Sequence, residues 1–116
     1  MAAFVALTGF MGSGKTSVGA AIAERLGWEF VDLDEEFVRA KGSIPKFFTE
    51  RGEAAFRACE SELLAAVFAQ DRAGGLVVAL GGGTLESPRA VEILRGQPGG
   101  PGRIVLLDVD PEEAWA

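Results

Sequence analysis

The sequence contains no histidine and a single cysteine, Cys59, among its 116 residues. Without histidine, imidazole catalysis and histidine metal sites are excluded, and one thiol cannot close a disulfide within the chain. A lone free thiol agrees with a reducing compartment, and no basic segment precedes the apolar start of the chain, as a secretory leader would require. We therefore expect a cytoplasmic protein.

Basic residues and long hydrophobic runs are also scarce. Lysine and arginine together number 11 against 17 aspartates and glutamates, which gives a net charge of −6. An acidic chain without a basic run is a poor general binder of nucleic acid or anionic membranes. No apolar stretch approaches the ~20 residues of a membrane span. We expect no nucleic-acid or membrane partner, and any polyanion must be bound by a local site.

What is present is an alternation of short apolar runs and helical patterns, as in α/β folds. Continuous apolar runs predict strands at residues 4–8, 30–34, 76–80 and 104–107. Helical spacing and capping residues predict helices at 15–26, 35–40, from Ser43 through Phe48, 53–70 and 88–94, with a further helix start at Asp110. The sequence thus predicts one α/β domain over residues 1–116, with helices on both faces of a parallel sheet.

Residues 9–16, GFMGSGKT, match the phosphate-binding pattern G-x-x-x-x-G-K-[ST] at every fixed position. Glycines let backbone N–H groups face a phosphate, and the following helix adds its N-terminal dipole. Lys15 supplies a cation for the β and γ phosphates, and Thr16 supplies a hydroxyl ligand for Mg²⁺. The nucleotide-binding residues predicted here are Gly12, Ser13, Gly14, Lys15, Thr16 and Ser17. The rival dinucleotide pattern G-x-G-x-x-G fails, because its third glycine would be Ser17.

Two further groups of unusual residues follow predicted strands: Asp32 with Asp34, and the triplet Gly81, Gly82 and Gly83. Ligands of parallel sheets bind at the carboxyl ends of the strands, so both groups are expected to meet the phosphate loop in space. A period of two places both aspartates on one side of the strand. The alternative is a solvated strand end, with Asp34 capping the next helix.

Taken together, these motifs resemble the shikimate kinases. The resemblance rests on residues 9–19 (GFMGSGKTSVG), on Asp32-Leu33-Asp34, and on Ile44 with Phe47-Phe48. It continues through Gly52-Glu53, Phe56-Arg57, Glu60 and the glycine triplet, in the family's order. The family implies a nucleoside-monophosphate-kinase-like sheet with strand order 2-3-1-4-5. It also implies transfer of the ATP γ-phosphoryl group to the 3-hydroxyl of shikimate, in aromatic amino-acid biosynthesis, by an enzyme that is monomeric when complete.

The resemblance also implies roles for particular side chains. Asp32 would meet Mg²⁺, and Asp34 would hydrogen-bond the substrate hydroxyls and take the proton of the attacking one. Arg57 would bind the shikimate carboxylate, with Glu60 orienting it. The alternative for Arg57 is an exposed helix arginine paired with Glu53 or Glu60 at helical spacing. Phe48 and Phe56 would wall the ring pocket, although aromatic residues are more often core. The backbone of Gly81, Gly82 and Gly83 would approach the substrate and the γ-phosphate.

The C-terminal part carries weaker signals. Asp108, after the run 104–107, imitates a magnesium aspartate, but the family takes that residue from the second strand, and Asp110 fits a helix cap better. Shikimate kinases continue with a lid, a fifth strand and a closing helix, which residues 1–116 are expected to lack; we expect these residues alone not to phosphorylate shikimate appreciably. The alternatives are a related small-molecule kinase of the gluconate type and a non-catalytic binding domain.

Overall fold

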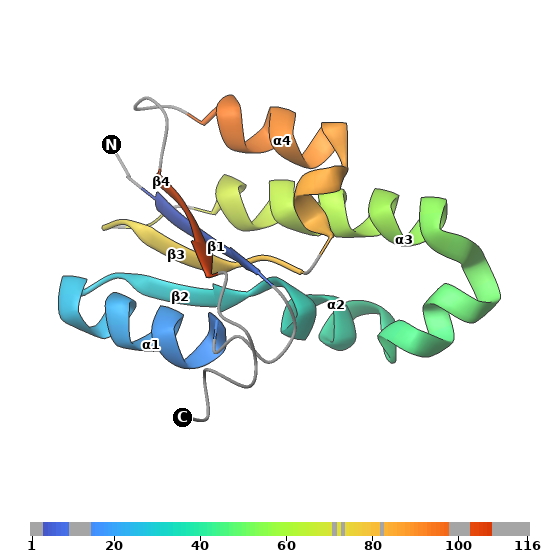
Figure 1. Cartoon of the computed structure of the whole chain (residues 1–116), viewed down its shortest axis with the longest axis horizontal. Helices are drawn as coiled ribbons and strands as arrows, with labels where there is room; N and C mark the ends of the chain where they lie inside the picture. Colours follow the sequence, from blue (N-terminus) through green and yellow to red (C-terminus); the bar gives the residue numbers. More distant parts are fainter. Residues whose placement is uncertain are drawn as a thin grey trace.

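A computed structural model describes residues 4–9, 15–70, 72, 74–81, 83–97 and 103–107 of the chain. Its elements alternate in the predicted order, as Figure 1 shows. The strands are β1 (Phe4–Gly9), β2 (Glu29–Asp32), β3 (Leu76–Ala79) and β4 (Arg103–Leu107). The helices are α1 (Lys15–Leu26), α2 (Leu33–Lys41), α3 (Ile44–Ala69), the short 3₁₀ helix η1 (Thr84–Glu86) and α4 (Pro88–Arg95).

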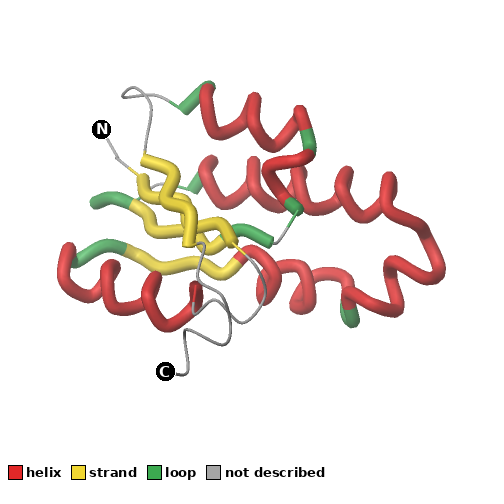
Figure 2. Tube along the Cα trace, in the orientation of Figure 1, coloured by secondary structure: helices red, strands yellow, loops and turns green. Residues whose placement is uncertain are grey.

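The four strands form one parallel sheet in the order β2-β3-β1-β4. This order confirms the family's arrangement for the four strands described. Because all strands run the same way, their carboxyl ends lie at one edge, and α2 and the first half of α3 project beyond that edge (Figures 1 and 2).

Helices cover both faces of the sheet and make a three-layer sandwich (Figure 1). Alternate strand residues divide between two cores, since successive side chains of a strand point to opposite faces. Phe4, Ala6 and Val78 pack on the face covered by α3 and α4. Leu7 and Val77 pack on the other face, which α1 covers. All five side chains are at most 5% exposed, so strands β1 and β3 are buried on both faces, as their continuous apolar runs predict.

The prediction for residues 30–34 was partly wrong. β2 ends at Asp32, and Leu33 and Asp34 belong to α2. The side chain of Asp32 accepts hydrogen bonds from the backbone N–H groups of Asp34 (3.0 Å) and Glu35 (3.3 Å) and so caps α2. The two aspartates therefore do not share one side of a strand, and the helix cap is Asp32 rather than Asp34.

Helix α3 consists of two helical segments that meet at Gly52. Ser43 caps the first segment by accepting a hydrogen bond from the Lys46 N–H, as predicted. Gly52 has φ 86° and ψ 170°, a conformation that side chains with a Cβ rarely adopt. The first segment leads onward from the end of α2, and after the turn at Gly52 the second segment comes back and runs along the sheet (Figure 1).

No helix among the described residues is long and apolar enough to cross a membrane. The predicted helix start at Asp110 and the weak metal candidate Asp108 lie outside the described residues.

Candidate functional site

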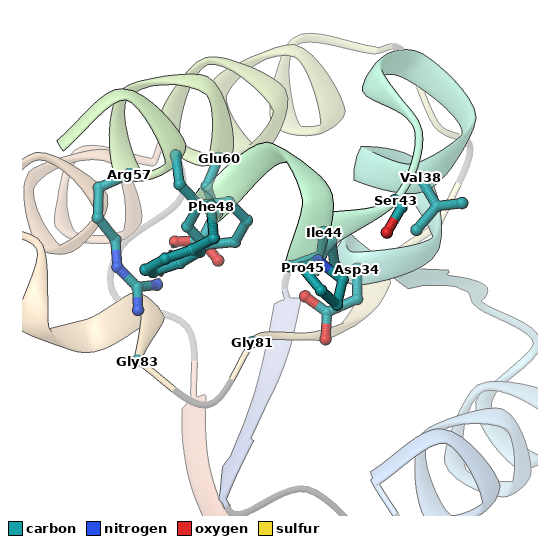
Figure 3. A pocket seen from close by; sticks show the side chains of 11 residues that line it. Asp34, Val38, Ser43, Ile44, Pro45, Phe48, Arg57, Glu60, Gly81 and Gly83 are labelled. Carbon is teal, nitrogen blue, oxygen red and sulfur yellow. Dashed lines mark hydrogen bonds and ion pairs between the residues drawn. The ribbon is translucent and has the colours of Figure 1, made fainter. Parts of the chain in front are cut away.

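A cavity of about 470 Å³ opens beyond the carboxyl ends of the strands (Figure 3). Its lining comes from α2, from both segments of α3 and from the glycine turn after β3. The lining residues are Asp34, Val38, Ser43, Ile44, Pro45, Phe48, Phe56, Arg57, Glu60, Gly81 and Gly83. The volume falls in the range of small-molecule sites, and the few polar groups stand among apolar walls, as such sites require.

Arg57 and Asp34 stand apart on the cavity wall, with Gly83 below the arginine and Gly81 nearer the aspartate (Figure 3). Arg57 comes from the second segment of α3, whereas Asp34 comes from the first turn of α2. The cavity therefore offers a cation and a carboxylate at separate places, so that a bound molecule could meet both.

A buried carboxylate holds Arg57. Nη1 of Arg57 donates to Oε1 of Glu60 at 2.9 Å, one helical turn away. Glu60 is only 2% exposed, and its second oxygen, Oε2, accepts a 3.0 Å hydrogen bond from Oγ1 of Thr84. Both oxygens of the glutamate are thus engaged, as a buried charge requires. The alternative paired an exposed Arg57 with Glu53 or Glu60. The pairing with Glu60 is present, but the Arg57 side chain is only 22% exposed and its partner is buried.

The glycine turn lets these side chains come close to the backbone. A Cβ at Gly83 would lie 2.4 Å from Nη2 of Arg57. A Cβ at Gly81 would lie 2.9 Å from Oε2 of Glu60 and 3.0 Å from Oδ1 of Asp34. Either methyl group would displace a polar atom of the site, so glycine is needed here for close approach. Gly82 lies outside the described residues.

Aromatic rings form the wall next to Arg57. The Phe56 ring is 4.9 Å from the Phe48 ring and 4.8 Å from the ring of Phe37, which is 1% exposed. The guanidinium carbon of Arg57 lies 5.1 Å from the Phe56 ring centre, within cation–π range. Phe48 and Phe56 both line the cavity, and Phe56 also packs against the buried ring of Phe37.

At the same edge of the sheet, Thr16 and Asp32 meet. Oγ1 of Thr16 donates to Oδ2 of Asp32 at 2.9 Å. One hydroxyl and one carboxylate oxygen are the donor types that Mg²⁺ prefers, and Mg²⁺ typically completes its shell with water and phosphate oxygens. The described residues contain no group of three or more acidic or sulfur ligands that could hold a metal by themselves. The pair therefore fits Mg²⁺ only as part of a phosphate complex.

Most of the other residues predicted to bind the nucleotide lie outside the part of the chain that the structure describes. Gly12, Ser13, Gly14 and the side chain of Lys15 are outside the described residues. Ser17 lies in the first turn of α1 and is exposed. Sequence reasoning gave Val38, Ser43, Pro45 and Thr84 no role in the site, although it marked Ser43 and Pro45 as a helix start. No local pattern marks them as site residues, because they reach the site only through the packing of α2, α3 and η1.

The comparisons with known proteins agree on one family. The family model described as shikimate kinase matches residues 11–116. Shikimate kinase of Chlorobaculum tepidum is 45% identical over 107 residues, covering 91% of this chain and 52% of that protein. Shikimate kinase of Streptomyces coelicolor is 41% identical over 114 residues, covering 97% of this chain and 62% of that protein.

Solved structures give the same result. Shikimate kinase from Acinetobacter baumannii, in complex with shikimate, superposes with a TM-score of 0.82 at 36% identity, covering 97% of this chain and 60% of that chain. Shikimate kinase from Bacteroides thetaiotaomicron gives a TM-score of 0.80 at 35% identity, covering 95% of this chain and 59% of that chain. The chain spans about half the length of the first curated relatives it matches. The phosphate-loop sequence, the sheet order and these matches together place the chain in the shikimate kinase family.

Proposed function

We propose that this chain provides the shikimate site and the phosphate loop of an enzyme that transfers the γ-phosphoryl group of ATP to the 3-hydroxyl of shikimate. One observation carries the proposal: a single cavity presents the guanidinium of Arg57 at one place and the carboxylate of Asp34 at another. Shikimate is a small ring that bears a carboxylate and several hydroxyl groups, so it needs one cationic and one acceptor group at separate points.

Arg57 would bind the substrate carboxylate. A planar guanidinium pairs with a carboxylate through two parallel N–H donors, and partial burial strengthens that pairing. The chain carries a net charge of −6, and Asp34 stands in the same cavity, so an anion needs a fixed cation to enter. The apolar side chains of Ile44 and Phe48 would contact the ring carbons.

Asp34 would accept hydrogen bonds from the substrate hydroxyls and take the proton of the attacking one. The hydroxyl oxygen then forms the new bond to the γ-phosphorus while the bond to the ADP oxygen breaks. Phosphoryl transfer depends chiefly on positioning and charge neutralisation, and the cap of α2 holds Asp34 at the edge where the phosphate loop follows β1.

Lys15 and the loop amides, with Gly12, Ser13, Gly14 and Ser17, would hold the ATP phosphates. Thr16 and Asp32 would hold Mg²⁺, which supplies charge neutralisation on the phosphates when bound. The hydrogen bond between Thr16 and Asp32 supports this assignment, since it shows both oxygens at one point. The backbone of Gly81, Gly82 and Gly83 would lie against the substrate and the transferred group. We also propose a monomeric, cytoplasmic enzyme without nucleic-acid or membrane partners.

Isothermal calorimetry with shikimate on residues 1–116, and coupled ADP release on the full-length protein that contains them, test the proposal. We expect saturable shikimate binding and shikimate-dependent ADP release. Binding without ADP release from the full-length protein would favour a non-catalytic binding domain. Gluconate accepted in place of shikimate would favour a gluconate-type kinase. Because gluconate also carries a carboxylate, this result would refute shikimate as the substrate and would leave the role of Arg57 to the Arg57→Ala variant.

A further inference from the structure

Thr84 lies directly behind the candidate site without lining the cavity. It is fully buried, at 0% exposure, and opens η1 just after the glycine turn. Its N–H donates to the carbonyl of Gly81, and its carbonyl accepts from the N–H of Ser87. Two backbone hydrogen bonds therefore fix where its side chain stands.

The hydroxyl of Thr84 has one defined donor role. Oγ1 lies 3.0 Å from Oε2 of Glu60, and an ionised carboxylate only accepts, so the threonine donates. Glu60 in turn accepts from Nη1 of Arg57 through its other oxygen. A chain of hydrogen bonds thus runs from the turn after β3 to the cation of the cavity.

This arrangement keeps Glu60 from occupying more of the guanidinium. A carboxylate and an arginine prefer a two-pronged pairing in which both terminal nitrogens donate. Here Glu60 contacts Nη1, while Nη2 of Arg57 lies over Gly83. Because Thr84 engages Oε2, the carboxylate is held in an orientation that leaves Nη2 to another anion.

We propose that Thr84 is a positioning residue for substrate recognition: by holding Oε2 of Glu60, it keeps part of the Arg57 guanidinium available to the carboxylate of the substrate. Without the hydroxyl, Oε2 would lose the donor that holds it, whereas Oε1 would keep its hydrogen bond to Arg57. Glu60 would then turn into the two-pronged pairing and compete with the substrate. The inference rests on the proposed function, since it assumes that Arg57 binds the substrate carboxylate.

The test compares Thr84→Val, which keeps the shape and loses the hydroxyl, with Thr84→Ser, which keeps the hydroxyl. Calorimetry should show shikimate binding about tenfold weaker for Thr84→Val and within about twofold of the parent for Thr84→Ser. Binding of ADP with Mg²⁺ should be unchanged in both variants. Parent-like shikimate binding by Thr84→Val, equal loss in Thr84→Ser, or a matching loss of ADP binding would each overturn the proposal.

A second measurement separates this inference from the proposed function. Side-chain ¹⁵N–¹H NMR of Arg57, without any substrate, reports the pairing of its guanidinium. We expect the Arg57 signals to move in Thr84→Val and to stay in Thr84→Ser. If the parent protein bound no shikimate, the proposed function would fail, while these signals would still decide whether Thr84 controls the pairing. Unmoved Arg57 signals in Thr84→Val, or in Thr84→Ala if the valine variant does not fold, would refute the inference.

Discussion

Thr16 and Asp32 are joined by a hydrogen bond of 2.9 Å from Oγ1 to Oδ2, although 16 positions separate them in the sequence. The same carboxylate accepts from two N–H groups of α2 through Oδ1. Asp32 therefore has two separable roles: one oxygen caps a helix, and the other meets the hydroxyl that follows the phosphate-loop lysine.

Substitutions of Asp32 should separate these roles. Asp32→Asn keeps an oxygen that can cap α2 but removes the negative charge, so we expect Mg²⁺-dependent ADP binding to weaken by roughly tenfold or more, with a melting temperature near that of the parent. Asp32→Ala loses the cap as well and should cost about 1 kcal/mol of unfolding free energy. Calorimetry with Mg²⁺ and with EDTA, beside thermal melts, checks both. Parent-like Mg²⁺-dependent binding in Asp32→Asn would remove Asp32 from the metal site.

Lys15 should be essential for phosphoryl transfer and dispensable for folding. It begins α1, directly after the glycine-rich loop, where a cation neutralises the β and γ phosphates. We expect Lys15→Ala to abolish shikimate-dependent ADP release in the full-length protein while leaving the circular dichroism spectrum intact. Arg25→Ala in the last turn of the same helix is the matched control and should retain turnover. Unchanged turnover in Lys15→Ala would refute the assignment.

Arg57→Ala should weaken shikimate binding by at least ~30-fold, because removing one partner of a desolvated charge pair typically costs ~2–5 kcal/mol. ADP binding should change little, since the two ligands use separate cations. The variant also leaves the buried Glu60 without its arginine, so a lower melting temperature is expected. Separate calorimetric titrations of shikimate and ADP decide the matter. Equal losses for both ligands, or no loss for shikimate, would place Arg57 outside the site.

Residues whose role follows from local pattern could be predicted from the sequence. The apolar runs placed the strands, Ser43 and Pro45 marked the start of α3, and Gly52 marked its break. Glu60 was predicted only through the family resemblance, as the residue that orients Arg57, and the structure gives it Arg57 and Thr84 as partners.

Residues whose role depends on contacts between distant segments could not be predicted from the sequence. The alternation of apolar and acidic residues in Val31-Asp32-Leu33-Asp34 imitates a strand. Val31 and Leu33 are both buried, yet the cap made by Asp32 starts a helix at Leu33. Thr84 looks like an ordinary turn residue. Its partner lies 24 positions away on α3, and no local signal reports that contact.

The last prediction concerns Gly83. Its φ of −116° is open to any residue, so a substitution there meets no backbone strain. The obstacle is space: a Cβ would lie 2.4 Å from Nη2 and 3.1 Å from Cζ of Arg57. Gly83→Ala must therefore push the guanidinium from its place beside Glu60. We expect shikimate binding to weaken by about tenfold, with ADP binding unchanged, because a displaced cation loses its pairing geometry with the substrate carboxylate.

Gly74→Ala is the matched control. A Cβ at Gly74 finds its nearest neighbour, Cδ1 of Trp28, at 3.5 Å, an ordinary contact at the opposite end of β3 from the cavity. Calorimetry should therefore show parent-like shikimate binding for Gly74→Ala and weaker binding for Gly83→Ala. If Gly83→Ala bound shikimate as tightly as Gly74→Ala, the guanidinium would have room to move without loss, and its position over Gly83 would not matter for recognition. If both variants lost affinity equally, the effect would come from general destabilisation, which thermal melts of the two variants would show.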